Sequence, residues 1–451
     1  MPISVASRRF FCILLTAFIA LQLSARMAVA EALHIVVSPA VRLIDTPVRI
    51  RVMGAAPHSR VTVSASVDRF GDRFASSATF SSDRFGTVDV SSMRPSAGSY
   101  AGVDSMGFLW SMSSAGKSPV AFQFSPEYFL KPWTISVSAR TERQSATVTF
   151  DRLVVAPNVV HVEKQEGSVI GALFHPASGG CFRGVLVLGG SDGNPRKEEA
   201  AILASHGFTT LAIALFGRPG LQPDLQEVPV ETVEAAIAVL HADPSVCAAP
   251  VAIVGESKGA ELGLLAATLL DGIAGVVAMS PSSVVFAGIG TSAHATSSWS
   301  WRKKPVPFVN GSTPDSVRAN IAQQRAQHQK VSYRDEYLAL LTGNTDPGAA
   351  IPVERIRGPV LLLAGSDDKV WPSDVMARQI SDRLTRYGHA YADRLIIFPK
   401  AGHQIGMPYA MTGVDLLTSG IAAGGTALGN ERADVAAWVE VLRFLDGLPK
   451  R

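Results

Sequence analysis

Hydrophobic and polar residues follow two different patterns along the chain, and the change falls near Pro157. Between residues 33 and 150, short runs such as 48–52 and 60–67 alternate apolar with polar side chains, and Gly, Pro, Ser and Asp separate the runs. A period of two residues between turns is typical of antiparallel strands that bury one face. The pattern predicts an N-terminal antiparallel β-sandwich domain over residues 31–155.

After Pro157 the apolar runs become continuous and alternate with segments of helical spacing. This alternation is typical of βαβ units, whose strands form a mostly parallel sheet covered by helices. It predicts an α/β domain over residues 156–451. The expected strands are 184–190, 209–214, 251–254, 275–279, 360–364 and 395–398, and the expected helices are 197–206, 231–240 and 431–445.

Residues 281–357 interrupt this second pattern. They lack clean strand runs and contain Trp299, Trp301 and a polar helix predicted at 316–329. A long insertion in such a sheet is expected to carry function and to lie over the active site. We therefore predict that residues 281–357 form a lid or cap that selects the substrate.

Residues 1–30 carry a targeting signal. Arg8 and Arg9 precede an apolar stretch at 10–23, and Ala-Val-Ala at 28–30 is a small-residue cleavage site, so we predict a signal peptide. The apolar stretch is shorter than the roughly 20 residues that span a bilayer. Residues 7–11 also match the twin-arginine export pattern. We expect an exported protein, periplasmic or secreted, with no stable membrane span after cleavage.

The composition excludes several other functions. Lys and Arg number 41 against 38 Asp and Glu, and the net charge of +3 gives no electrostatic basis for binding nucleic acid. Neither H-x-x-x-H nor C-x-x-C spacing occurs, so we expect no metal site. The chemistry described next requires no cofactor. The sequence predicts nothing about the oligomeric state.

A candidate nucleophile stands directly after the expected strand 251–254. Gly255-Glu256-Ser257-Lys258-Gly259 is followed at once by helix-forming residues, which is the strand-turn-helix context of a G-x-S-x-G nucleophile elbow. The turn is so tight that the residues two before and two after the serine must lack bulk. The serine hydroxyl then lies at the positive end of the helix.

A serine hydroxyl requires a base and an orienting carboxylate to react. The order expected in an α/β-hydrolase is serine, acid, histidine. Asp368 follows the expected strand 360–364 at the usual spacing, with Asp367 as the alternative acid, and His403 follows strand 395–398. We predict Ser257, Asp368 and His403 as the catalytic residues.

Two further features follow from this fold. The expected oxyanion hole consists of two backbone N–H groups. One belongs to Lys258 and the other to Gly190 or Ser191, in the glycine-rich turn 189–193 in which strand 184–190 ends. Cys181 and Cys247 each precede one of two strands that are neighbours in this fold. We therefore expect a disulfide between them at the edge of the sheet opposite the active site.

The chain resembles the acyl-CoA thioesterases and bile acid-CoA:amino acid N-acyltransferases, which join an N-terminal β-sandwich to an α/β-hydrolase domain. The resemblance spans nearly all of the chain after residue 30. It depends on residues 46–50, 102–112, 255–262, 367–372, 402–403, 408–409 and 424–425.

This resemblance implies hydrolysis of a small acyl thioester, acyl-CoA first of all, or transfer of its acyl group, with Ser257, Asp368 and His403 on the family's triad positions. Family members that acylate amino acids tend to carry cysteine as the nucleophile, so serine favours hydrolysis. Acyl-CoA is an intracellular metabolite, and export leaves an esterase or acyltransferase on non-CoA substrates as an alternative. A non-catalytic binding protein is a remote alternative, which the complete set of Ser, Asp and His disfavours.

Overall fold

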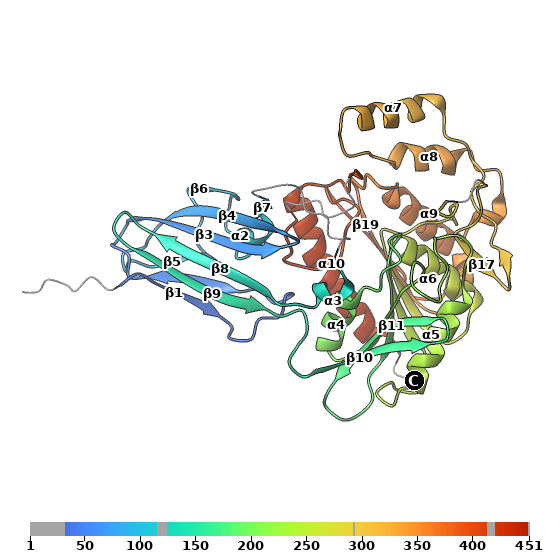
Figure 1. Cartoon of the computed structure of the whole chain (residues 1–451), viewed down its shortest axis with the longest axis horizontal. Helices are drawn as coiled ribbons and strands as arrows, with labels where there is room; N and C mark the ends of the chain where they lie inside the picture. Colours follow the sequence, from blue (N-terminus) through green and yellow to red (C-terminus); the bar gives the residue numbers. More distant parts are fainter. Residues whose placement is uncertain (1–31, 115–123, 292–293, 413–419, 450–451) are drawn as a thin grey trace, which may run out of the picture.

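The computed structural model describes residues 32–114, 124–291, 294–412 and 420–449, and the predicted signal peptide lies outside these ranges. Figure 1 shows an elongated β unit joined to a larger unit of strands and helices. Within the described ranges, no helix is long and apolar enough to cross a membrane.

The N-terminal unit consists of two antiparallel sheets that share one core, as predicted. The sheets bury one face each because their strands alternate, as β3 (Arg60–Arg69) shows: Val61 and Val63 are buried, whereas Thr62 and Ser64 are only partly covered. The smaller sheet has the order β1 (His34–Ser38), β2 (Arg49–Met53) and β5 (Val88–Asp89). The larger has β6 (Ala97–Gly98), β4 (Asp72–Ser81), β3, β8 (Trp133–Arg140) and β9 (Ser145–Arg152), with β7 (Ser113–Ser114) paired to β4.

The C-terminal unit is built on one eight-stranded sheet. The two antiparallel strands at one edge, β10 (Val159–Glu166) and β11 (Val169–Pro176), were not among the predicted strands. The six later strands of this sheet pair in parallel with one another, as expected. The order continues from β10 and β11 through β13 (Thr209–Ile213), β12 (Gly184–Leu188), β15 (Val251–Glu256), β16 (Ile273–Met279), β19 (Val360–Gly365) and β20 (Arg394–Phe398).

Helices cover both faces of this sheet because its strands are apolar on both sides. In β12, Val185 and Val187 pack toward α4 (Lys197–Ser205) and α10 (Ala427–Gly447). Leu186 and Leu188 face the opposite core. That core is covered by α5 (Glu231–Ala242), α6 (Lys258–Leu269) and α9 (Ser373–Arg386). This arrangement is the predicted α/β-hydrolase fold.

The sandwich packs against the face that carries α4 and α10 (Figure 1). Two short helices, α2 (Gly107–Trp110) and α3 (Pro126–Phe129), contact α10 and α4 respectively. The buried side chains of both units form one continuous hydrophobic cluster. The sandwich is therefore part of the wall beside the catalytic sheet rather than a separate appendage.

Residues 281–357 form the predicted irregular insertion. In Figure 1, α7 (Asp315–Ala326) and α8 (Arg334–Thr342) project as a helical hairpin away from the body of the molecule. The other elements are β17 (Trp299–Trp301) and β18 (Lys304–Pro305), which extend a small sheet begun by β14 (Val228–Pro229), and the 3-10 turns η2 (Pro347–Ala349) and η3 (Val353–Arg355).

The structure joins Cys181 and Cys247 in a disulfide, with their Cα atoms 4.8 Å apart. The two cysteines precede β12 and β15, which pair in parallel. Ser257 follows the other end of β15. The crosslink is thus at the edge of the sheet opposite the candidate active site.

Candidate active site

Ser257 occupies a sharp turn between β15 and α6. Its backbone has φ 56° and ψ −120°, a conformation that side-chain-bearing residues seldom adopt and that is typical of strained functional turns. A Cβ atom on Gly259 would lie 2.3 Å from the carbonyl oxygen of Leu188, and one on Gly255 would lie 2.5 Å from that of Gly259. Both glycines of the G-x-S-x-G motif are therefore required by backbone contacts.

Ser257, His403 and Asp368 lie in one continuous chain of hydrogen bonds. The Oγ atom of Ser257 is 2.9 Å from Nε2 of His403, and Nδ1 of His403 is 2.8 Å from Oδ2 of Asp368. Ser373 Oγ donates to the same carboxylate oxygen at 2.6 Å, and the backbone N–H of Val370 donates to the other oxygen at 2.9 Å. This fixes the orientation of the fully buried Asp368 carboxylate.

The alternative acid, Asp367, points elsewhere. Its carboxylate lies 2.7 Å from Nζ of Lys369 and accepts the backbone N–H of Gly425 at 3.1 Å. The side chain is 42% exposed, whereas that of Asp368 is fully buried. The carboxylate that forms the hydrogen bond to His403 is therefore that of Asp368 and not that of Asp367.

The surroundings of His403 favour its protonated form. Burial alone would lower the pKa of this imidazole, but the charge and the hydrogen bond of Asp368 outweigh burial, and the pKa is raised above its ordinary value. The Trp371 ring packs edge-on against the imidazole at 5.8 Å between centroids. The histidine is therefore held in place by both a carboxylate and an aromatic ring.

The expected oxyanion donors lie next to Ser257. Lys258 is the first residue of α6, so its backbone N–H has no partner within the helix. Gly190 approaches closely, since a Cβ placed on it would be 3.5 Å from that of Ser257, and Gly190 and Ser191 both line the adjoining cavity. The positions suit two donors that converge beside the serine hydroxyl.

The Lys258 side chain makes a buried ion pair that the sequence did not reveal. Its Nζ lies 3.0 Å from Glu261 Oε1 and donates to Ser298 Oγ at 2.8 Å. Trp299 Nε1 donates to the same Glu261 oxygen at 2.8 Å. Residues of the 281–357 insertion thus support the first turn of α6 from behind.

A cavity of about 530 Å³ opens beside Ser257 and His403. Its lining corrects the prediction that residues 281–357 lie over the active site as a lid. No described residue of 281–357 lines it. Phe70, Phe129 and Trp133 of the sandwich form one wall, because the sandwich packs against α4. The insertion instead packs behind the acid loop, where the rings of Phe286 and Tyr337 contact Trp371.

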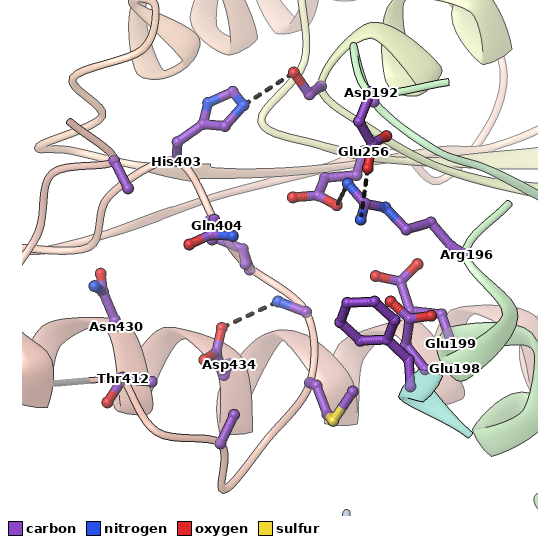
Figure 2. A pocket seen from close by; sticks show the side chains of 18 of the residues that line it. Asp192, Arg196, Glu198, Glu199, Glu256, His403, Gln404, Thr412, Asn430 and Asp434 are labelled. Carbon is purple, nitrogen blue, oxygen red and sulfur yellow. Dashed lines mark hydrogen bonds and ion pairs between the residues drawn. The ribbon is translucent and has the colours of Figure 1, made fainter. Parts of the chain in front are cut away.

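Sequence reasoning also missed a group of charged residues in this cavity. Figure 2 shows Arg196 between Asp192 and Glu256, at 3.6 Å and 3.4 Å, with the carboxyl groups of Glu198 and Glu199 directed toward it. Two glutamates in the first turn of a helix give no functional signal in a sequence, because acidic residues stabilise that turn wherever they occur. Glu256 occupies a position that the G-x-S-x-G motif leaves unspecified, so the motif gives it no role either.

Within the described ranges, no group of three or more His, Cys, Asp and Glu side chains is arranged to hold a metal ion.

The fold and this site define an enzyme of the α/β-hydrolase class. Residues 45–166 match the model of the acyl-CoA thioester hydrolase/BAAT N-terminal region, and residues 228–448 match that of the BAAT/acyl-CoA thioester hydrolase C-terminal domain. The chain belongs to the family of acyl-CoA thioesterases and bile acid-CoA:amino acid N-acyltransferases, as the sequence resemblance predicted. It is a hydrolase that acts on thioester or ester bonds.

Similar proteins span both domains. Mouse acyl-coenzyme A thioesterase 1 is 28% identical over 411 residues, covering 89% of this chain and 93% of its own. Mouse mitochondrial acyl-coenzyme A thioesterase 2 is 29% identical over 411 residues, covering 89% and 86%. Mouse acyl-coenzyme A amino acid N-acyltransferase 1 is 28% identical over 428 residues, covering 91% and 97%.

Proposed function

We propose that this protein hydrolyses small acyl thioesters through a covalent acyl-serine on Ser257. One observation carries the proposal: the unbroken hydrogen-bond chain from Ser257 through His403 to Asp368, which opens onto a partly apolar cavity. The names of the relatives, thioesterases and an N-acyltransferase, supply the substrate class. Acyl-CoA is therefore the first substrate to assay.

Two half-reactions follow from this arrangement. His403 accepts the hydroxyl proton as Ser257 attacks the acyl carbonyl, and the thiol leaves with that proton. Water then attacks the acyl-serine, again deprotonated by His403, and releases the acid. Asp368 keeps the imidazole in the tautomer that presents Nε2 to the serine. The N–H groups of Lys258 and of Gly190 or Ser191 stabilise the oxyanion of both tetrahedral intermediates.

The raised pKa of His403 determines how the activity should depend on pH. The imidazole must be neutral to accept a proton, so activity is full above this pKa and is lost as the pH falls through it. Because Asp368 holds the pKa above its ordinary value, the acid limb should lie at higher pH than for a free histidine. The pH profile of kcat/KM measures this limb.

Hydrolysis is favoured over acyl transfer because the nucleophile is a serine, whose acyl ester is open to attack by water. An amino-acid acceptor distinguishes the two outcomes. Adding glycine to the reaction should leave the free acid as the product, and an N-acyl amino acid detected by mass spectrometry would establish transfer instead.

A fluorophosphonate probe tests the proposal most directly, because it reacts with activated serines. We expect stoichiometric labelling of Ser257, with loss of both labelling and turnover in Ser257→Ala at unchanged circular dichroism. Ser366→Ala, which removes a serine from the loop after β19, is the matched control and should retain both. An unlabelled wild-type protein that hydrolyses neither acyl-CoA nor nitrophenyl esters would refute the proposal.

We also propose that the mature protein is exported, on the strength of the predicted signal peptide at residues 1–30. N-terminal sequencing of protein recovered outside the cytoplasm should begin at Glu31. An intact N-terminus in the cytoplasmic fraction would overturn this.

A further inference from the structure

The two donors of the proposed oxyanion hole lie on separate loops. One N–H belongs to Gly190 or Ser191 in the turn 189–193 after β12, and the other to Lys258 at the start of α6. An oxyanion hole stabilises a developing charge only where both donors already point at the same oxygen. The pairing of β12 with β15 ends before either donor. A contact between the two loops beyond the strand ends would therefore fix how the donors lie relative to each other.

The guanidinium group of Arg196 makes a contact of this kind, because it lies between carboxylates of the two loops (Figure 2). Its Nη1 is 3.6 Å from Oδ2 of Asp192, which directly follows Ser191 in the turn. Its Nη2 is 3.4 Å from Oε2 of Glu256, which directly precedes Ser257. The bridge thus joins a residue beside one candidate donor to a residue beside the nucleophile.

The Arg196 side chain also packs along the turn itself. A Cβ atom on Gly189 would lie 3.3 Å from Cγ of Arg196. One on Gly190 would lie 3.6 Å from Nη2 of Arg196 and 3.5 Å from Cβ of Ser257. The turn that carries the second donor is therefore in close contact with both the arginine and the nucleophile.

Charge and shape both suit a fixed bridge. The charges of Asp192 and Glu256 outweigh burial and raise the pKa of Arg196, so the group stays charged. Without it, the two carboxylates would repel each other and drive the two loops apart. A guanidinium presents its nitrogens in a rigid planar fork, so it can hold two carboxylates at a set spacing, whereas an ammonium group is a single point of charge.

We propose, building on the proposed function, that Arg196 is a positioning residue that bridges Asp192 and Glu256 and so holds the turn 189–193 against the nucleophile elbow. Both oxyanion donors then converge on the substrate carbonyl. The bridge acts mainly in the tetrahedral intermediates, where that oxygen carries a full negative charge, and little in the bound substrate. Its loss should therefore lower kcat and leave KM nearly unchanged.

Steady-state kinetics of four variants test the bridge. Arg196→Gln should lower kcat by about 10²-fold, the cost of one lost oxyanion donor, and Arg196→Lys should recover only part of it because the fork is missing. Asp192→Asn should lower kcat by about tenfold, and because Asp192 is exposed this variant tests the bridge even if Arg196→Gln fails to fold. Arg383→Gln breaks an ion pair with Glu354 elsewhere in the same domain and should keep the wild-type kcat. An unchanged kcat in Asp192→Asn and in folded Arg196→Gln would overturn the proposal.

The kinetics are compared on the pH plateau, because Arg196 also acts on the base. Burial and the charge of Arg196 lower the pKa of His403, whereas Asp368 and Glu256 raise it. Removing Arg196 should therefore raise this pKa and move the acid limb to higher pH. The loss of kcat should persist above the limb. A kcat that recovers fully on the plateau would show that Arg196 acts only through the charge of His403, and would overturn the positioning role.

Inhibitor binding separates positioning from substrate binding. An alkyl trifluoromethyl ketone adds to Ser257 and places an oxyanion in the hole, whereas an S-alkyl coenzyme A thioether of the same chain length has no carbonyl group. Arg196→Gln should weaken inhibition by the ketone about 10²-fold and by the thioether less than about threefold. Equal losses for both ligands would assign Arg196 to substrate binding or to general stability, and would overturn the proposal.

The same assay distinguishes this proposal from the proposed function. Equal inhibition of the wild type and Arg196→Gln by the ketone would overturn the positioning role alone. A wild-type protein that neither the ketone nor the fluorophosphonate affects would refute the proposed function, and the positioning role with it.

Discussion

The hydrogen-bond chain at Ser257 and the cavity beside it are assembled in different ways. Ser257, Asp368 and His403 each follow a strand of one parallel sheet, so the sheet places all three at the same edge. The cavity wall draws on the sandwich, on α4 and on the segment after His403. Its shape therefore depends on how two domains pack.

This difference separates chemistry from substrate choice. A change within the strand ends should alter the reaction with any substrate. A change at the domain junction should alter stability and substrate selection first, because the reacting groups do not depend on it directly. The following predictions test this division, beginning with the largest effect.

Asp368→Asn should lower kcat/KM by about 10³-fold or more, because an amide can hold His403 in the wrong tautomer. Asp367→Asn is the matched control, one residue away, and should stay within about threefold because its partner is a surface lysine. Steady-state assays of both variants make the comparison. Equal losses in the two variants would show that the acid has been misassigned.

Gly259→Ala should lower kcat/KM by about 10²-fold, since a misplacement of about 1 Å at a reacting group costs that much. The added Cβ would meet the Leu188 carbonyl oxygen at 2.3 Å and force the elbow to move. Gly179→Ala, where nothing lies within 4 Å, should behave like the wild type. If Gly259→Ala retained full activity, the elbow would be less constrained than the structure indicates.

The part of the site that sequence could predict is the part that strand ends determine. The hydrogen-bonded group of Ser257, Asp368 and His403 could be predicted because each residue follows an apolar run within a few positions, and the parallel sheet brings the ends of those strands together. The residues of the cavity wall had no such signal. Phe70 is 187 positions before Ser257 in the chain, and only the packing of the sandwich on α4 brings it to the cavity.

The fold shows the same division. Continuous apolar runs and alternating runs predicted the two domains, because a strand that is buried on both faces is apolar throughout and a strand that is buried on one face alternates apolar with polar residues. No such pattern in the sequence indicates where the 281–357 insertion packs. It was expected over the cavity, but α7 and α8 project away from the body, and the sandwich occupies the place that a lid would take.

Arg152→Met should destabilise the junction between the domains by about 3 kcal/mol, because it leaves buried carbonyl groups without a donor. The guanidinium group of Arg152 is fully buried and donates to the carbonyl oxygens of Ile44 and Thr46 in the sandwich and of Tyr409 in the hydrolase domain. Arg140→Met, at an exposed end of β8, should change stability little. Urea unfolding measures both, and a KM increase larger than the kcat decrease in Arg152→Met would support the division argued above.

Glu431→Gln should change the free energy of unfolding least at low pH, and the change should grow as the pH rises. Burial, followed by the charge of Asp104, raises the pKa of Glu431 to about 8 from its ordinary value of 4.5. The unfolded chain therefore binds fewer protons than the folded chain between these values, and the wild type loses stability as the pH rises from about 5 to 8. The cost is on the order of a few kcal/mol for a buried group.

The glutamine variant lacks this ionisation, so its stability should decline less over the same window. Urea unfolding at pH 5 and pH 8 measures the decline, with Glu234→Gln on the surface of α5 as the control that should follow the wild type. The junction between α10 and the sandwich would then be the place where pH acts on the fold, whereas His403 is the place where it acts on the chemistry. Parallel curves for the wild type and Glu431→Gln would mean that Glu431 titrates alike in both states, and the pH dependence of stability would have to come from the cavity carboxylates.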